Sequence, residues 1–85
     1  MKTIPPKEYK INENGIEYDV IEYGGGIKYW YFNNKLHRIN GPAIEYPNGD
    51  KEWYLDGLQY GKKEYFLELL KRNLITKKEA FIELI

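Results

Sequence analysis

The chain has 85 residues, in which 13 basic residues balance 13 acidic ones, and it contains no cysteine. This length suits a single domain, residues 1–85, with little core to spare. The zero net charge gives no overall field to attract nucleic acid or a membrane surface. Without cysteine, neither disulfides nor thiolate zinc sites add stability. No apolar run approaches the roughly 20 residues of a membrane span, and residues 1–10 do not match a signal peptide. We therefore expect a cytoplasmic protein.

The first strands are predicted from a turn signal at Asn14-Gly15, which favours a tight hairpin between strands over residues 9–13 and 16–23. Alternating apolar residues in a strand mark the face that is buried. In the second strand this alternation changes phase near Asp19–Val20, and the change predicts a β-bulge at that point.

An internal repeat follows. Residues 21–31 read IEYGGGIKYWY and residues 44–54 read IEYPNGDKEWY, so that Ile, Glu, Tyr, Gly, Lys, Trp and Tyr coincide. Each copy predicts one hairpin: a short strand, a glycine-containing turn and a second strand. The repeat therefore predicts an antiparallel meander of about six strands over residues 8–60.

The faces of this meander follow from the alternation within each copy. Aromatic and aliphatic residues recur on one shared face, which we predict to be the structural core: Trp30, Phe32, Trp53 and Leu55. The opposite face differs between the copies, and in the first copy it carries tyrosines. That face is either covered by the C-terminal segment or left as a binding surface.

The period changes from strand to helix after residue 61. Within residues 62–72, one stripe is formed by Tyr65, Phe66, Leu69 and Leu70, and this predicts an amphipathic helix. Thr76 with an acid three residues later matches a capping box that opens a last helix over residues 77–85. The predicted fold class is α+β, with the helical hairpin covering one sheet face or capping the open end of the sheet.

The stretch within residues 21–61 that resembles a known family reads FNNKLHRINGPAIEYPNGDKEWYLDG. This stretch resembles the MORN-like β-hairpin repeats of small bacteriophage and giant-virus proteins, and more distantly antitoxin components of toxin–antitoxin modules. The resemblance implies a β-meander scaffold with a non-enzymatic interaction role. The chain departs from the repeat at Asn34, where glycine is preferred, and at residues 58–61, where Leu-His-Arg is expected.

His37 and Arg38 form the first candidate binding site. A guanidinium beside an imidazole suits an anionic group such as a phosphate. The alternative is that the pair serves folding, by hydrogen-bonding turn carbonyls or by stacking on tryptophan. Because the pair belongs to a repeat unit, we favour the structural role.

Tyrosines form the second candidate, and basic side chains the third. Tyr18, Tyr29, Tyr31 and Tyr54 would make a partner-binding or base-stacking surface if exposed, and core if covered. The basic set of the C-terminal segment, which we interpret as a solvated helix surface, comprises Lys62, Lys63, Lys71, Arg72, Lys77 and Lys78.

Groups that carry catalysis are scarce. The chain has one histidine, no cysteine and no serine, and no spacing typical of a metal site. We therefore expect no enzyme, no metal and no cofactor.

Our leading hypothesis from the sequence is a phage-encoded binding protein, anti-CRISPR-like, that occupies and inhibits a host defence or regulatory protein in the host cytoplasm. The alternative is a sponge for a small anionic ligand such as a nucleotide, held by Arg38, His37 and tyrosines. We expect neither a membrane nor a nucleic-acid partner. Sheet edges left by a short repeat array make homo-oligomerisation a further possibility.

Overall fold

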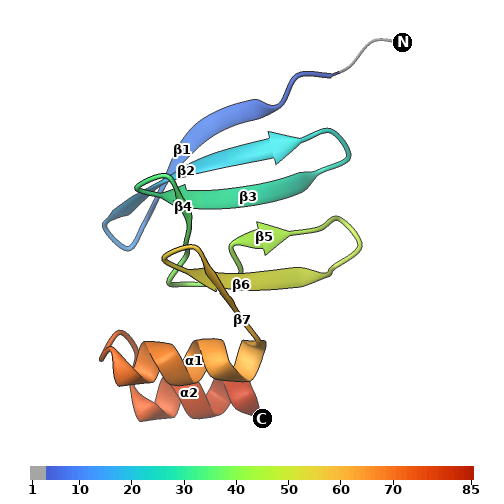
Figure 1. The fold of residues 1–85 in the computed structure, drawn as a ribbon. Coiled ribbons are helices and arrows are strands. Elements are labelled where there is room, and N and C mark those ends of the chain that lie inside the picture. Colours follow the sequence, from blue (N-terminus) through green and yellow to red (C-terminus); the bar gives the residue numbers. More distant parts are fainter. Residues whose placement is uncertain (1–3) are drawn as a thin grey trace.

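The computed structural model describes residues 4–85, which form a sheet of hairpins followed by two helices (Figure 1). The strands are β1 (Lys7–Glu13), β2 (Ile16–Tyr23), β3 (Ile27–Phe32), β4 (Lys35–Leu36), β5 (Ile44–Glu45), β6 (Lys51–Leu55) and β7 (Leu58–Tyr60). The helices are α1 (Lys62–Lys71) and α2 (Lys77–Leu84). The predicted α+β class is therefore confirmed.

The sheet has the order β1-β2-β3-β5-β6-β7, with β4 paired beside β5 on the same edge of β3. Every pairing is antiparallel. The sequence predicted about six strands and the structure has seven, because the chain leaves the edge of β3 after β4 and returns as β5. We call the crossing segment, residues 37–43, the connector.

The prediction of a β-bulge in β2 is wrong. This strand pairs residue for residue with β1 and with β3, and its register is continuous through Val20. The apolar pattern changes phase because the first half of β2 has its apolar residues on one face and the second half has them on the other. Tyr18 and Val20 are fully buried on the first face, and Ile21 and Tyr23 lie on the second. A strand with apolar residues on both faces shows no single alternation.

Left-handed residues close the hairpins. Asn33 and Asn34 both have positive φ, at 51° and 62°, in the turn between β3 and β4. Asp56 and Gly57 play the same part between β6 and β7, with φ of 53° and 82°. Two successive positive φ values match the twist of a two-residue hairpin. Asparagine tolerates this region better than other residues with a Cβ, which explains why Asn34 replaces the glycine of the repeat.

The sheet has an inner face, which bears the connector, and an outer face. Tyr18, Val20, Trp30 and Ala43 form one buried cluster on the inner side. The second cluster joins β6 to α1 and contains Leu55, Tyr65, Phe66 and Leu69. Of the predicted core residues, Trp30 and Leu55 are buried and Trp53 is half-buried against the second cluster. Phe32 is 37% exposed, since it lies at the end of β3 beside the turn.

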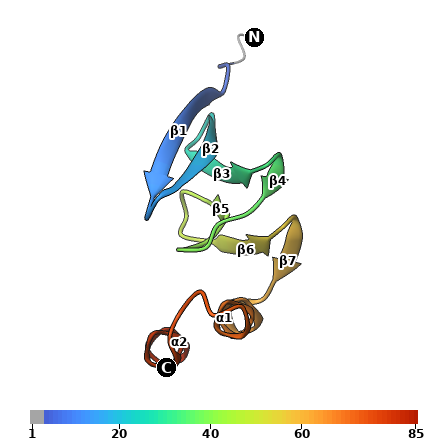
Figure 2. The same cartoon turned by 90° about the vertical axis from the view of Figure 1, so that its left-hand side faces the viewer.

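The helices cap one end of the sheet (Figure 2). Of the predicted stripe of α1, Tyr65, Phe66 and Leu69 are buried in the second cluster, and Leu70 is half-buried. The predicted capping box at Thr76 is present at the start of α2. Only Ala80 of α2 is buried, so this helix contributes little to the core. Leu74, in the turn between the helices, is 44% exposed.

Candidate functional site

His37 lies inside the fold, where the connector begins. Its side chain is 9% exposed and its ring lies 5.7 Å from that of Phe32, centroid to centroid. The backbone N–H of Asp56 donates a hydrogen bond to Nδ1 at 2.9 Å, which requires this nitrogen to be unprotonated. Burial lowers the pKa of His37, against a smaller opposing attraction from the Asp56 carboxylate. His37 thus joins the connector to the β6–β7 turn.

Arg38 is the charged centre of the inner face. Its guanidinium carbon lies 3.6 Å from the centroid of the Trp30 ring, a stacked cation–π geometry. Nε and Nη2 donate to the two carboxylate oxygens of Glu13 at 3.0 and 2.8 Å. Nη1 donates to the Glu45 carboxylate and, at 3.2 Å, to the Pro42 carbonyl. Burial opposes the charge of Arg38, but these two carboxylates outweigh burial and raise its pKa.

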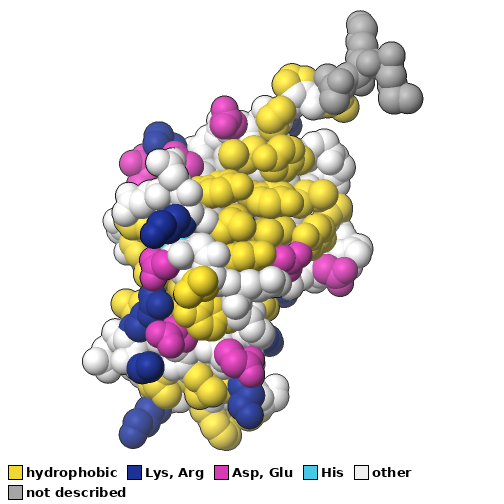
Figure 3. All heavy atoms as spheres, viewed as in Figure 1, with side chains coloured by type: hydrophobic (Ala, Val, Ile, Leu, Met, Phe, Trp, Pro, Cys, Tyr) yellow, Lys and Arg dark blue, Asp and Glu magenta, His cyan; other side chains and the backbone are white. Residues whose placement is uncertain are grey.

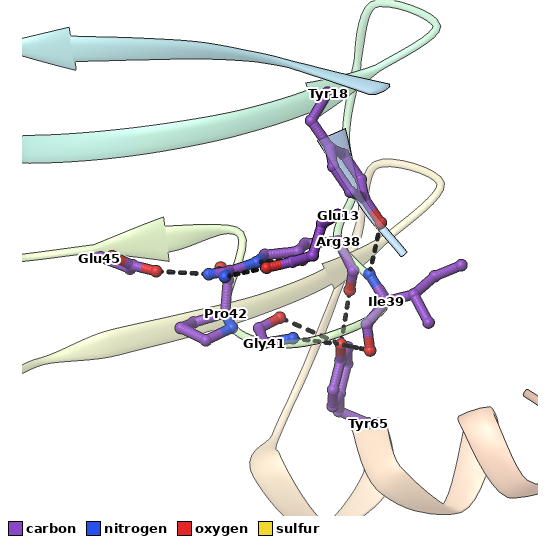
Figure 4. A network of polar contacts seen from close by, with 8 residues as sticks. All are labelled: Glu13, Tyr18, Arg38, Ile39, Gly41, Pro42, Glu45 and Tyr65. Atoms are coloured by element: carbon purple, nitrogen blue, oxygen red, sulfur yellow. Dashed lines mark hydrogen bonds and ion pairs between the residues drawn. The ribbon is translucent and has the colours of Figure 1, made fainter. Parts of the chain in front are cut away.

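Two tyrosine hydroxyls fix the backbone of the connector from opposite sides (Figure 4). The Tyr18 hydroxyl accepts a hydrogen bond from the Ile39 N–H at 3.1 Å. The Tyr65 hydroxyl, on α1, lies within hydrogen-bond distance of the carbonyls of Arg38, Ile39 and Gly41. Each ring belongs to a different buried cluster. The connector therefore ties the two clusters together.

Close packing explains the glycine of the Gly-Pro pair. A Cβ on Gly41 would lie 3.0 Å from Cζ and from Nη1 of Arg38, inside normal contact distance. The contacts of His37 and Arg38 are therefore made within the fold. Together with the tyrosine hydroxyls, they hold the connector in place. The donors of Arg38 are directed at carboxylates and a carbonyl of the chain itself, and its side chain is 12% exposed.

The other tyrosine candidates lie on the outer face. The register places Tyr29 and Tyr31 of β3 there together with Ile21, and Tyr54 shares the face from β6. The rings of Tyr29 and Tyr31 stack at 6.4 Å with an interplanar angle of 13°. Tyr18, which the sequence grouped with them, belongs to the inner face and is fully buried.

The sequence missed two further members of this surface, Tyr23 and Tyr46. Tyr23 is 40% exposed and packs edge-on against Tyr29 at 5.1 Å. Tyr46 is half-buried in the turn region after β5. Both stand in the Ile-Glu-Tyr triplet that ends the first strand of each repeat copy, and this signal could have identified them. We define the outer tyrosine face as Ile21, Tyr23, Ile27, Tyr29, Tyr31, Tyr46 and Tyr54.

Figure 3 shows this surface as a continuous apolar field over β2, β3 and β5. Among residues 4–85 no helix lies across it, since α1 and α2 pack at the end of the sheet beyond β6. A hollow of about 480 Å³ adjoins the field at Lys10, Asp19 and Tyr31. The helical segment therefore leaves the outer tyrosine face accessible.

One carboxylate is set into the outer tyrosine face. Glu52 of β6 accepts hydrogen bonds from the Tyr46 hydroxyl, from the Tyr54 hydroxyl at 3.1 Å and from Gln59 at 3.2 Å. The bond to Glu52 raises the pKa of Tyr46 to about 12, because the phenol is held as the donor. Burial and the same carboxylate raise the pKa of Tyr54. The cluster is thus a negative charge surrounded by neutral phenols.

The basic set of the helices is largely solvated. Its five lysines are exposed, and Arg72 pairs with Glu68 and Asp56 at 2.9 Å each. Within residues 4–85 no three side chains of the types that bind metals are grouped as a metal site would require. The described helices include none that is long and apolar enough to cross a membrane.

Comparison of the chain with protein-family models, with curated proteins and with solved structures found no match. The MORN-like character of the repeat therefore remains a resemblance carried by the residues quoted above.

Proposed function

We propose that this chain is a non-enzymatic binding domain whose outer tyrosine face docks onto another protein. The observation that carries the proposal is that Tyr23, Tyr29, Tyr31, Tyr46 and Tyr54 gather on one accessible side of a sheet in which the inner face already supplies the core. Tyrosine is enriched at protein interfaces, because a stiff ring gives a large apolar contact and the hydroxyl still finds a hydrogen-bond partner.

The shape and chemistry of the surface favour a protein over a nucleic acid. Stacking platforms for single strands combine aromatic rings with basic side chains that follow the phosphates. Here the strand residues that share the outer face include Glu8, Glu17, Asp19 and Glu52, and the base among them, Lys10, pairs with Asp19 at 2.8 Å. Phosphates would be repelled by this face.

The finer proposal concerns the partner and its setting. Following the resemblance to viral MORN-like repeats, we propose a phage-encoded inhibitor that occupies a host defence or regulatory protein in the host cytoplasm. Such a protein needs a contact surface and no catalytic group, and the outer tyrosine face supplies the surface. The alternative of an anion sponge at His37 and Arg38 gains no support from the geometry, because the donors of Arg38 are directed at Glu13, Glu45 and Pro42.

The proposal is tested by capture from bacterial lysate with paired variants. We expect wild-type protein to capture one partner in stoichiometric amount, and the double variant Ile27→Ser/Tyr31→Ser to lose it. Leu58→Ser/Phe81→Ser is the matched control, since these residues are 64% and 67% exposed and lie off the outer tyrosine face. Circular dichroism confirms that both variants fold. A wild-type protein that captures nothing, or two variants that capture equally, would contradict the proposal.

A further inference from the structure

On the inner face, a cluster of an aromatic ring and two carboxylates binds an arginine of the chain itself. There the Arg38 guanidinium stacks on Trp30 and donates to the carboxylates of Glu13 and Glu45. The ring face attracts the cation and the carboxylates neutralise it. This arrangement satisfies the charges of Arg38, Glu13 and Glu45 within the chain.

The outer face carries the same two components without the cation. Glu52 is half-buried among Tyr46, Tyr54 and Gln59, and all three of its hydrogen-bond donors are neutral. No lysine, arginine or histidine of residues 4–85 forms an ion pair with it. A carboxylate accepts about four hydrogen bonds, so three donors leave room for one more. Burying this charge under a partner would be costly unless a cation came with the partner.

We infer that the partner of the outer tyrosine face presents an arginine, which docks against Tyr46 and Tyr54 and donates to Glu52. The inference rests on the proposed function and specifies the chemistry of the partner. A planar guanidinium suits the site because it stacks on an aromatic ring while its edge donates to a carboxylate. Arg38 does both on the other side of the same sheet.

The other charged residues of the outer face also favour a basic partner. Carboxylates of the outer face stand on β1, β2 and β6, at Glu8, Glu17, Asp19 and Glu52. The one lysine that β1 places on this face, Lys10, is already paired with Asp19. Although the whole chain is neutral, this side is therefore acidic. An acidic aromatic surface complements a basic apolar one, and such complementarity sets the choice of partner.

The test uses a defined probe. An N-acetylated, C-amidated hexapeptide of alternating arginine and leucine carries basic and apolar side chains without terminal charges, and a glutamate–leucine hexapeptide is its control. Both are titrated into the full chain and followed by amide NMR shifts. We expect the arginine peptide to bind in the millimolar range with shifts centred on residues 46, 52 and 54, and binding to weaken as salt is raised.

Two isosteric variants separate the local site from general charge. Glu52→Gln keeps the size of the side chain and removes its charge, and we expect it to weaken peptide binding about tenfold. Glu17→Gln removes one charge from the same face, away from Tyr46 and Tyr54, and we expect less than twofold. Thermal unfolding of both variants verifies that they remain folded.

Three results would overturn the inference: no binding of the arginine peptide, equal binding of the glutamate peptide, or equal loss in the two variants. The proposed function fails on a different result, the absence of a partner lost with Ile27→Ser/Tyr31→Ser. If a partner is captured and Glu52→Gln retains it fully, the function stands and the arginine inference is wrong.

Discussion

The two faces of the sheet are both rich in aromatic residues, yet only one of them is closed. On the inner face the connector crosses between the hairpins and covers Trp30 with Arg38. On the outer face the tyrosines pack beside one another and no segment among residues 4–85 crosses them. Aromatic content therefore does not distinguish the covered face of the sheet from the accessible one. The path of the connector does.

The charges differ between the faces in the same way. The inner face holds one arginine between two carboxylates, whereas the outer face holds Glu52 among neutral donors. Removing one partner of a buried ion pair is destabilising, because the other charge is left buried and unpaired. A surface carboxylate without a cation instead favours a basic binding partner. The comparison predicts that inner-face substitutions act on stability and outer-face substitutions act on binding.

The largest expected effect is on the inner face, from Arg38→Ala. The substitution leaves the carboxylates of Glu13 and Glu45 without their cation and uncovers Trp30, so we expect a loss of about 3 kcal/mol in the free energy of unfolding. Urea unfolding measures this loss. Arg72→Ala is the matched control, since its pairs with Glu68 and Asp56 are more exposed, and we expect about 0.5 kcal/mol. Equal losses in the two variants would contradict the stabilising role assigned to Arg38.

A smaller effect is expected from Tyr65→Phe. Removing the hydroxyl takes away the one buried donor that lies within hydrogen-bond distance of the carbonyls of Arg38, Ile39 and Gly41, and we expect a loss of about 2 kcal/mol. Tyr46→Phe removes a hydroxyl from the outer face, where water replaces it, and we expect little change in melting temperature. A variant Tyr65→Phe as stable as wild type would show that the connector is not held from α1.

The mildest inner-face effect follows from the titration of His37. Burial lowers its pKa in the folded protein, so the unfolded chain binds the proton more readily. Stability is then complete above the unfolded value of about 6.5 and falls as the pH drops from there through the folded pKa. We expect the melting temperature to fall between pH 7 and pH 5.5.

His37→Asn serves as the control for this titration. An asparagine oxygen can accept from the Asp56 N–H in place of Nδ1, and the slope between pH 7 and pH 5.5 should flatten. A slope unchanged by the substitution would assign the pH dependence to other groups.

The hairpins are predictable from sequence because their signals are local. Asn14-Gly15 and the repeated Ile-Glu-Tyr and Trp-Tyr elements lie within a few residues of the turns that they predict. The capping box at Thr76 is local in the same sense. Such signals survive because the turn itself dictates which residues fit it.

The assignment of faces was harder, and the reasons are long-range. Tyr18 is buried in the inner cluster, where its hydroxyl accepts from Ile39, 21 residues further along the chain. Arg38 likewise donates to Glu13 at a separation of 25 residues. Alternation within a strand cannot show where the connector will cross. For this reason the sequence groups Tyr18 with the outer tyrosines, and the apolar residues on both faces of β2 suggest a bulge that the strand does not contain.

The most direct test of the account compares two glutamates on neighbouring strands and opposite faces, Glu45→Gln on β5 and Glu52→Gln on β6. We predict that Glu45→Gln weakens the Arg38 ion pair and lowers the melting temperature by about 4–8 °C, because losing a partly exposed pair costs about 1 kcal/mol. Binding of the arginine–leucine peptide should stay unchanged in this variant. Glu52→Gln should leave the melting temperature close to wild type and weaken peptide binding about tenfold. The opposite pattern, with Glu52→Gln unfolding early and Glu45→Gln losing the peptide, would contradict the division of the two faces into scaffold and interface.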